Sequence, residues 1–300
     1  MFIVYTPTLV RLGPIERYSS MQWRRRYRGA GDFELHMPYN SLLVPENIIR
    51  NGDEAGIIES VTISHDEENG TMAEVHGRFL IGYLARRIIL DAVSMTDTPE
   101  TIIKAIVSDN LRGIDFTIES SQSFTGSMIY ENQYGNLLEE IEAIADFAEL
   151  GIKVDFDRVF KVYEGLDRST LQSTNPRAIF SRSFENLLSS EYYVDTTSAV
   201  NVVTDGTNTI GSATGIDRRE GYAKDNLELA LMREPESFTA ELNPYGNLRY
   251  KTDYDLGDIV TIKEFALTVN TRIIEINEIY EDEGFKLEIT FGYERVMKLG

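Results

Sequence analysis

Alternation of apolar and polar residues near the C-terminus is the feature that most constrains the fold of this chain. The segment FKLEITFGY places five large apolar residues on one face: Phe285, Leu287, Ile289, Phe291 and Tyr293. This period of two is typical of a strand with one face in a core. The turn EDEG joins it to TRIIEINEIY, which predicts a β-hairpin. A second hairpin is predicted over residues 57–77, where VTISH and AEVHG flank DEENG.

The middle of the chain has helical signals instead. TDTPETIIKAIVSDNL predicts a helix with Thr98 as its N-cap and Pro99 in the first turn. A second helix is predicted over residues 136–150, with Gly151 as its C-cap. Short strands are expected at 114–119 and in IKVDF and RVFKVYEG. The segments FLIGYL and RRIIL, before the first helix, are expected to continue the strand pattern.

The predicted order is therefore β, then α+β, then β. We predict a mainly β fold with an inserted α+β region, because 300 residues with 42% hydrophobic content can build more than one core. The expected domains are residues 1–94, 95–175 and 176–300. A Gly/Thr/Ser-rich loop is expected at residues 205–215 of the third domain.

Composition excludes several classes of protein. The absence of cysteine rules out disulfides, thiolate zinc sites and a cysteine nucleophile. No apolar run approaches the roughly 18–20 residues that span a bilayer, and there is no signal-peptide pattern. We therefore expect a soluble chain without a membrane-spanning segment, made in a cytoplasm. A net charge of −20 argues against a protein that binds phosphate backbones over a wide surface.

No catalytic or cofactor motif stands out. There is no G-x-S-x-G elbow, GSATG lacks the P-loop lysine, and DYDLGD lacks the length of a calcium loop. His65 and His76 flank the predicted hairpin turn, but a metal site would need further ligands such as Asp66 or Glu74. Two solvated strand histidines are the preferred interpretation. We predict no catalytic, cofactor-binding or metal-binding residues, and no enzyme activity.

Four arginines lie close together in WRRRYRGAGDFEL, within this acidic chain. The turn GAG predicts a hairpin around it. That pairing would set Arg28 opposite Asp32 and Arg26 opposite Glu34, so most of the charge is compensated within the hairpin. The segment is therefore interpreted as a hairpin and not as a nucleic-acid-binding arm.

Arg25 is the exception, because it falls on the apolar face of this hairpin, opposite Leu35. The first thirty residues carry six arginines and one glutamate, whereas residues 252–300 carry eleven acids and five bases. Such asymmetry permits contacts between copies of the chain. We therefore predict that Arg25, together with Arg11 and Arg17, contacts the acidic surface of a neighbouring subunit.

Four long segments resemble one family of phage proteins, in the order in which they occur there. They are SSMQWRRRYRGAGDFELHMP, GNLLEEIEAIADFAELGIKVDFD, NPRAIFSRSFENLLSSEYYVD and DYDLGDIVTIKEFALTVNTRIIEINEIYEDEGFKLEITFGY. The family is that of the siphophage ReqiPepy6-type tail proteins, the baseplate or tail-tip hubs. These resemble in fold the baseplate hubs of contractile phages and the N-terminal part of tail-associated proteins.

The resemblance implies a structural virion protein with two tail-tube-like β-barrel domains. Three chains would form a ring that continues the lumen of the tail tube. The implied partners are further copies of the chain, the distal tail protein, the tail tube protein, the tape measure protein and tip or receptor-binding proteins. Viral DNA would pass through the lumen only transiently. The expected location is the virion tail, after assembly in the cytoplasm of the host bacterium.

An acidic lumen would repel DNA during ejection, which gives the net charge a role. The candidate lumen-facing acids lie near the second predicted helix and in the C-terminal β region: Glu139, Glu140, Glu142, Glu275, Glu278, Glu281, Asp282 and Glu283. Two other functions stay open. One is a carbohydrate-binding adhesion module, which needs an exposed aromatic platform. The other is a cell-wall hydrolase, which needs a pair of carboxylates with perturbed pKa values.

Overall fold

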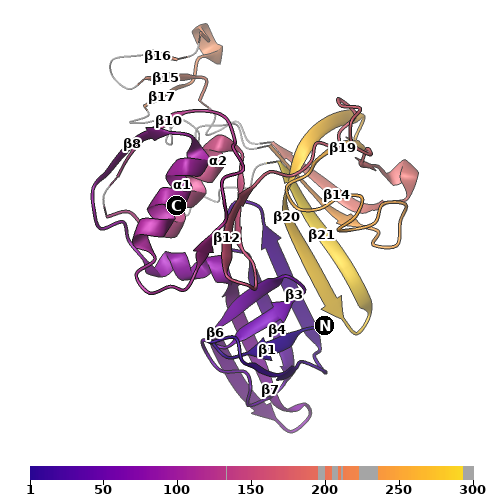
Figure 1. The fold of residues 1–300 in the computed structure, drawn as a ribbon. Helices are drawn as coiled ribbons and strands as arrows, with labels where there is room; N and C mark the ends of the chain where they lie inside the picture. The colour runs from indigo at the N-terminus through magenta and orange to yellow at the C-terminus, as the bar shows by residue number, and fades with distance from the viewer. Residues whose placement is uncertain (133, 195–199, 205–208, 211, 223–235, 293–300) are drawn as a thin grey trace.

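The computed structural model describes residues 1–132, 134–194, 200–204, 209–210, 212–222 and 236–292 (Figure 1). Tyr293, expected on the apolar face of the last strand, lies outside the described residues, as does part of the loop expected at residues 205–215.

One large, mainly antiparallel sheet runs through both β regions of the chain (Figure 1). Its strands are β1 (Ile3–Tyr5), β2 (Arg11–Pro14), β3 (Ser20–Arg26), β4 (Asp32–Pro38), β5 (Ile48–Asn51), β6 (Glu54–Asp66), β7 (Gly70–Phe79), β13 (Ile179–Phe180), β14 (Leu187–Val194), β18 (Glu236–Leu242), β19 (Ile259–Glu264), β20 (Leu267–Glu281) and β21 (Gly284–Gly292). The strand order is β14-β18-β21-β20-β3-β4-β7-β6-β5-β1-β2, and β19 pairs with both β13 and β20.

The two β regions are joined where β3 pairs with β20, from Ser20 opposite Glu281 to Arg26 opposite Glu275. Because β3 uses its other edge for β4, the N-terminal and C-terminal strands form one continuous surface. Over the residues that the structure describes, this sheet ends at β14 and β2, and no closed barrel is seen. The mainly β class is confirmed, whereas the two barrels stay a prediction.

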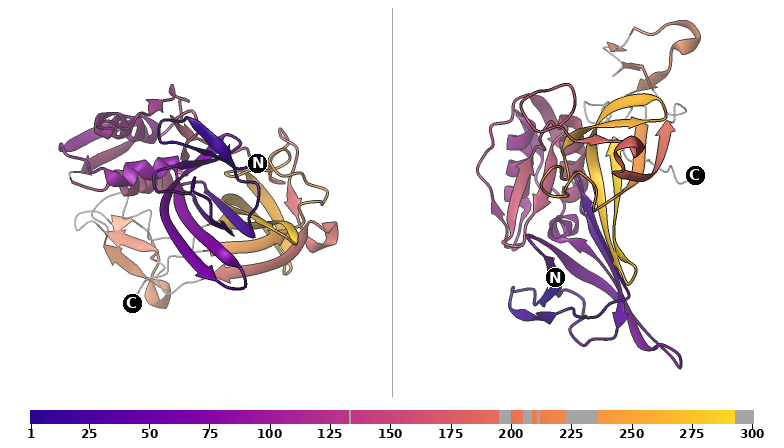
Figure 2. Two further views of the ribbon diagram at one scale, coloured as in Figure 1. Left: turned by 90° about the horizontal axis from the view of Figure 1, so that it is seen from below. Right: turned by 90° about the vertical axis from the view of Figure 1, so that its right-hand side faces the viewer.

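The hairpins predicted around DEENG and EDEG are present. Strands β6 and β7 pair from Gly56 opposite Phe79 to Asp66 opposite Gly70, and the two strands extend away from the rest of the molecule (Figure 2). Strands β20 and β21 pair around the turn that ends at Gly284, whose φ of +131° suits glycine.

The inserted region has two helices and two small sheets. Its elements are η1 (Leu80–Arg86), β8 (Val93–Asp97), α1 (Pro99–Asn110), β9 (Thr117–Ile118), β10 (Met128–Asn132), α2 (Leu137–Ala148), β11 (Gly151–Val154) and β12 (Val159–Tyr163). Strand β8 pairs with β10, and β12 pairs with β11 and β9. The Thr98 hydroxyl accepts a hydrogen bond from the Thr101 N–H, as the predicted N-cap requires.

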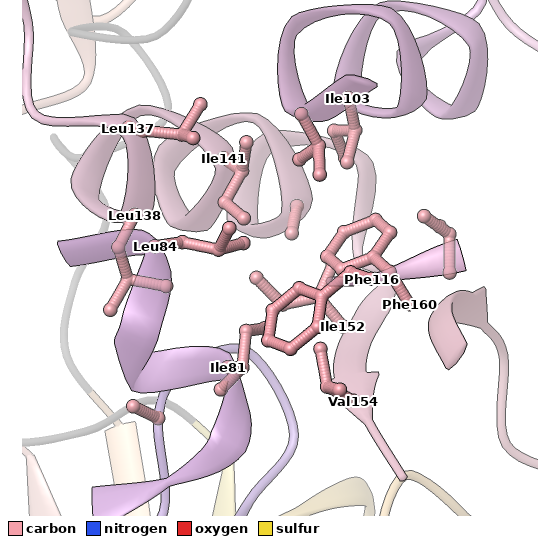
Figure 3. Close-up of a cluster of buried hydrophobic side chains, with 14 of the residues drawn as sticks. Ile81, Leu84, Ile103, Phe116, Leu137, Leu138, Ile141, Ile152, Val154 and Phe160 are labelled. Carbon is pink, nitrogen blue, oxygen red and sulfur yellow. The ribbon is translucent and has the colours of Figure 1, made fainter. Parts of the chain in front are cut away.

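Three local predictions were wrong. RRIIL is not a strand, since only Ile88 within it forms a bridge, an isolated one with Asn136. FLIGYL is not a strand but largely the 3₁₀ helix η1, because Leu80, Ile81 and Leu84 all turn into one core. Figure 3 shows Leu84 beside α2 and Ile81 beside Ile152 of β11. Helix α2 ends at Glu149, which takes the left-handed conformation itself at φ 57°. Gly151 instead begins β11, where a Cβ atom would lie 2.4 Å from Tyr27.

The remaining described elements are η2 (Arg182–Phe184), β15 (Val202–Thr204), β16 (Thr209–Ile210), η3 (Gly215–Asp217) and β17 (Glu220–Tyr222). Strands β15, β16 and β17 form a small separate sheet.

Three clusters of buried apolar side chains support these layers. One lies under the N-terminal strands around Trp23 and Phe33, and a second lies under the C-terminal strands around Phe180 and Phe291. The third, shown in Figure 3, joins both helices and η1 to β11 and β12. Burying large side chains in this way contributes roughly 1.5–3 kcal/mol each.

Candidate functional site

The arginine-rich strand β3 lies at the centre of the sheet, and its two faces have different roles. The structure pairs Asp32 with Arg24, whereas the sequence predicted that Asp32 would pair with Arg28. The register is therefore displaced by four residues, and because this number is even, each side chain keeps its predicted face. Trp23 is buried, whereas Arg24 is half-buried on the opposite face.

That opposite face continues as a belt of polar side chains across the sheet, and we call it the polar face. Its residues are in register in four rows. The rows are Ser189–Glu241–Glu288–Asn277–Arg24–Asp32–Arg78, Glu191–Thr239–Thr290–Glu275–Arg26, Lys286–Ile279–Gln22–Glu34–His76–Ser60 and Glu281–Ser20–His36–Glu74–Thr62. Eight carboxylates and four Lys or Arg side chains belong to these rows, so the polar face is acidic.

The arginines of the polar face are compensated, as predicted, but partly by different residues. The Asp32 carboxylate forms ion pairs with the guanidinium groups of Arg24, at 2.8 Å, and Arg26, at 2.7 Å. Arg26 also contacts Glu275 of β20 at 2.9 Å, and not Glu34. These half-buried pairs therefore connect the N-terminal strands to the C-terminal strands, at about 0.2–1 kcal/mol for each cross-strand pair.

Arg25 points to the other side of the sheet and is only 7% exposed. Its guanidinium contacts Glu54 at 2.5 Å and Asp255 at 2.6 Å, and it donates to the Tyr250 hydroxyl at 2.8 Å. We call Arg25, Glu54, Tyr250, Asp255 and Glu278 the Arg25 cluster. The predicted contact of Arg25 with a neighbouring subunit was wrong, because the side chain is buried among partners of its own chain.

The other end of the Arg25 cluster is Glu278, which is 1% exposed. It accepts hydrogen bonds from Tyr250 at 2.7 Å and Tyr280 at 2.6 Å, and it contacts Lys251 at 2.8 Å. The prediction that Glu278 faces a lumen was therefore wrong as well. Glu278 lies one position from the polar-face residues Asn277 and Ile279 of the 15-residue strand β20, so the alternation of strand faces places it on the buried side, opposite Trp23.

The electrostatics of the Arg25 cluster keep Arg25, Asp255 and Glu278 charged. Burial alone would lower the pKa of Arg25. Glu54, Tyr250 and Asp255 together raise it by more than burial lowers it, so the pKa of Arg25 is well above its ordinary value. Burial also works to raise the pKa of Asp255 and Glu278. The positive charge of Arg25 outweighs burial at Asp255, and that of Lys251 outweighs burial at Glu278. The pKa values of both carboxyl groups are therefore lowered. The arrangement is that of a structural ion network.

The remaining predicted acids are distributed over three places. Glu275 and Glu281 lie on the polar face, and Asp282 and Glu283 lie in the exposed turn between β20 and β21. Glu139, Glu140 and Glu142 are on α2.

Two of the three predicted acids on α2 accept hydrogen bonds within the chain. Glu140 accepts a hydrogen bond from the Tyr130 hydroxyl, and Glu142 accepts one from the Ala30 N–H beside the β3–β4 turn. Arg11 and Arg17 are exposed near the N-terminus.

A cleft of about 640 Å³ lies beside the Arg25 cluster, between the N-terminal strands, β11–β12 and the segment before β19. Arg50, Lys153, Asp155 and Asp255 line it, so its charges are mixed. A hydrolase acting on glycans needs a carboxylic acid with a raised pKa. Asp255, which lines the cleft, does not have this property, because Arg25 outweighs its burial and lowers its pKa. No described helix has the length and apolarity needed to cross a membrane.

Sequence reasoning missed the partners of Arg25. Glu54 and Asp255 lie 29 and 230 positions away from it, and no local pattern announces such contacts. It also missed the juxtaposition of His36 and His76, for which a signal exists. Each histidine follows a glutamate by two residues, in ELH and EVH, and these strands pair.

Comparisons with known structures identify relatives of the whole fold. A tail protein from Neisseria meningitidis MC58 is 15% identical with a TM-score of 0.65, over 97% of this chain and 95% of that one. The prophage tail protein gp18 from Listeria monocytogenes EGD-e is 14% identical with a TM-score of 0.63, over 98% and 95% of the two chains. The 43 kDa tail protein of prophage MuSo2 from Shewanella oneidensis is 12% identical with a TM-score of 0.62, over 97% of each chain.

A more distant match is the E. coli c3393 protein, described as a component of the type VI secretion system with structural similarity to the T4 tail proteins gp27 and gp5. It is 10% identical with a TM-score of 0.51, over 93% of this chain and 74% of that one. No protein of curated description matches the sequence. These likenesses concern the fold. The family described as Siphovirus ReqiPepy6 Gp37-like protein matches residues 2–219 and 223–293. The chain therefore belongs to the Siphovirus ReqiPepy6 Gp37-like protein family, which confirms the resemblance found in its sequence.

Proposed function

We propose that this chain is a structural protein of a phage tail, the hub that continues the tail tube at its distal end. The observation that supports this most is the likeness of nearly the whole fold to three tail proteins, together with membership of a siphovirus family. The likeness to a protein that resembles gp27 supports the hub position in particular. Such a hub belongs to the virion tail.

In this proposal three chains form a ring, and each contributes an N-terminal and a C-terminal tube-like domain. The junction of β3 with β20 holds the two domains in one continuous sheet. A rigid connection of this kind suits a ring that must match the repeat of a tail tube, because closed symmetric rings need a fixed angle between neighbouring units. The exposed arginines Arg11 and Arg17 are candidates for contacts between subunits.

We further propose that the polar face lines the lumen. Its eight carboxylates and four basic side chains give it a negative surplus, and an acidic wall repels DNA phosphates during ejection. Glu275 and Glu281 belong to this wall, and Asp282, Glu283, Glu139, Glu140 and Glu142 are further candidates beside it. The partners are the tail tube, distal tail, tape measure and tip proteins.

The mass of the particle in solution tests the ring. A trimer has about 102 kDa, which is three times the chain mass of 34.1 kDa. The chain is measured alone and after co-expression with the tail tube and distal tail proteins of the same particle. Three-fold complexes in either sample are expected, whereas a monomer in both samples contradicts the hub.

The lining of the lumen is tested on that assembly. Glu191, Glu241 and Glu288 of the polar face are replaced by lysine, and Glu16, Glu67 and Glu68, which are exposed elsewhere, are replaced in a matched control. We expect the polar-face variant to assemble but to retain DNA in its channel at low salt, and the control to behave as the natural chain. A reconstruction with the polar face on the outside of the ring would refute this lining.

A further inference from the structure

Two Glu-x-His segments meet on the polar face. Glu34 and His36 belong to β4, and Glu74 and His76 belong to β7. The antiparallel register sets Glu34 opposite His76 and His36 opposite Glu74. All four side chains therefore project from neighbouring positions to the same side of the sheet, where β4 and β7 lie side by side (Figure 1).

The side-chain atoms of these four residues are close together. His36 Nε2 lies 2.6 Å from Glu34 Oε1, and His76 Nε2 lies 2.7 Å from Glu74 Oε1. His76 Nδ1 is 3.9 Å from the second oxygen of Glu34. One nitrogen or oxygen atom from each of Glu34, His36 and Glu74 lies within 4.8 Å of the other two. The ligand atoms of Glu34, His36 and Glu74 thus converge without any change in the backbone, and His76 adjoins this group through its contacts with both glutamates.

The charges of this group are not balanced by nearby cations. Within the described part of the chain, neither glutamate forms an ion pair with lysine or arginine. The adjacent arginines have other partners, since Arg24 binds Asp32 and Arg78 binds Glu59. Two carboxylates therefore face two imidazoles, and a bound divalent cation would neutralise them.

We propose that Glu34, His36, Glu74 and His76 bind one divalent transition-metal ion, and that Zn²⁺ suits this set best. Imidazole nitrogens and carboxylate oxygens are ligands of zinc at about 2.0–2.2 Å, and no thiolate is required. Ligand atoms at the corners of a tetrahedron of that size lie about 3.4 Å apart. At present His36 and Glu34 are 2.6 Å apart, no pair among Glu34, His36 and Glu74 exceeds 4.8 Å, and His76 lies 2.7 Å from Glu74, so rotations of these exposed side chains reach this value.

The location suits ion binding in two further ways. The four side chains are 38–46% exposed, so an ion reaches them from solvent. Their backbones are fixed in the interior of a sheet, since β4 also pairs with β3 and β7 with β6, and this reduces the reorganisation on binding. The ion would connect β4 to β7. This inference departs from the sequence-based expectation of no metal site, and it depends on neither the ring nor the tail.

Zinc titration of the tag-free full chain by calorimetry tests the proposal, with ZnCl₂ as the probe. We expect saturable binding of one ion per chain. His36→Ala and His76→Ala should each weaken binding by more than about tenfold, since even the loss of a residue that only supports a ligand costs about 10- to 100-fold. His65→Ala is the matched control, because this third histidine is exposed and hydrogen-bonded to Thr71 in another part of the hairpin.

A thermal shift provides the second readout, because a ligand that binds only the folded state raises the melting temperature. Zinc should raise it for the natural chain and His65→Ala, and not for His36→Ala or His76→Ala. Circular dichroism without metal checks that each variant is folded, and His36→Gln or His76→Gln replaces the alanine variant at the same position if that variant is not. The proposal is overturned if zinc does not saturate, if neither histidine variant weakens binding, or if His65→Ala weakens it equally.

Discussion

Replacement of Arg25 by alanine should destabilise the folded chain strongly. The guanidinium side chain is 8% exposed and contacts two carboxylates at 2.5 and 2.6 Å. Removing one partner of a buried ion pair costs about 3–5 kcal/mol, because the remaining charges are left without compensation. Glu54 is 19% exposed and Asp255 is 43% exposed, so water compensates Asp255 in part. We therefore expect about 3 kcal/mol, at the lower end of this range.

Thermal unfolding measures this loss. A destabilisation of this size should lower the melting temperature by about 5 °C in a chain of 300 residues, because the entropy of unfolding grows with chain length. Arg17→Ala is the matched control, since Arg17 is exposed and surface substitutions usually change stability by less than about 0.5 kcal/mol. Arg25→Lys should recover only part of the loss, because an ammonium group lacks the fork that reaches both carboxylates.

The pH dependence has a defined sign. The folded-state pKa of Asp255 is lowered, so its contribution is present above its ordinary pKa and is lost as the pH falls through the folded value. The difference between Arg25→Ala and the natural chain should therefore be largest at neutral pH and shrink in acid. A loss below about 1 kcal/mol at pH 7, equal to that of Arg17→Ala, would refute the view that Arg25 stabilises the junction of the β regions.

Two further substitutions probe the rest of the fold. Glu100→Gln should destabilise the inserted region by about 2–3 kcal/mol at pH 7. Glu100 is 1% exposed and contacts Lys104 at 2.6 Å. It also accepts hydrogen bonds from the Ser121 hydroxyl and from the Gln122 and Phe124 N–H groups. Burial works to raise the pKa of Glu100, but these donors outweigh it and the pKa is lowered. The loss of stability, measured by urea unfolding, should therefore shrink as the pH falls below 4.5. A loss that does not change with pH would contradict an ionised Glu100. Gly77→Ala should cost about 1–3 kcal/mol, because a Cβ atom would lie 1.9 Å from the Ile57 carbonyl oxygen and 2.5 Å from the Phe33 ring. Thr71→Ala, at an exposed position of the same strand β7, is its control in the same unfolding assay. Equal stability of the two variants would show that the strands move apart at Gly77 at no cost and make room for the Cβ atom.

Local structure followed from short sequence patterns. The turns DEENG and EDEG predicted two hairpins because glycine supplies the backbone angles that such turns need. Thr98 predicted the start of α1, because a side-chain cap acts within a few residues of itself. The even displacement of the β3–β4 register changed the partners but not the faces, since strand faces alternate with a period of two.

Long-range relations were decided only by the tertiary structure. The apolar run FLIGYL has no preference strong enough to choose between strand and 3₁₀ helix, and burial of Leu84 under α2 decides it. The charge of Arg25 was visible in the sequence, but its partners come from residues 54 and 255, which only the pairing of β3 with β20 and the packing of both β regions bring to it. Sequence therefore determined most of the strands and both long helices, and which of their faces are apolar. Packing determined which charges are buried as structural ion pairs and which form the polar face, because desolvation depends on neighbours that are distant along the chain.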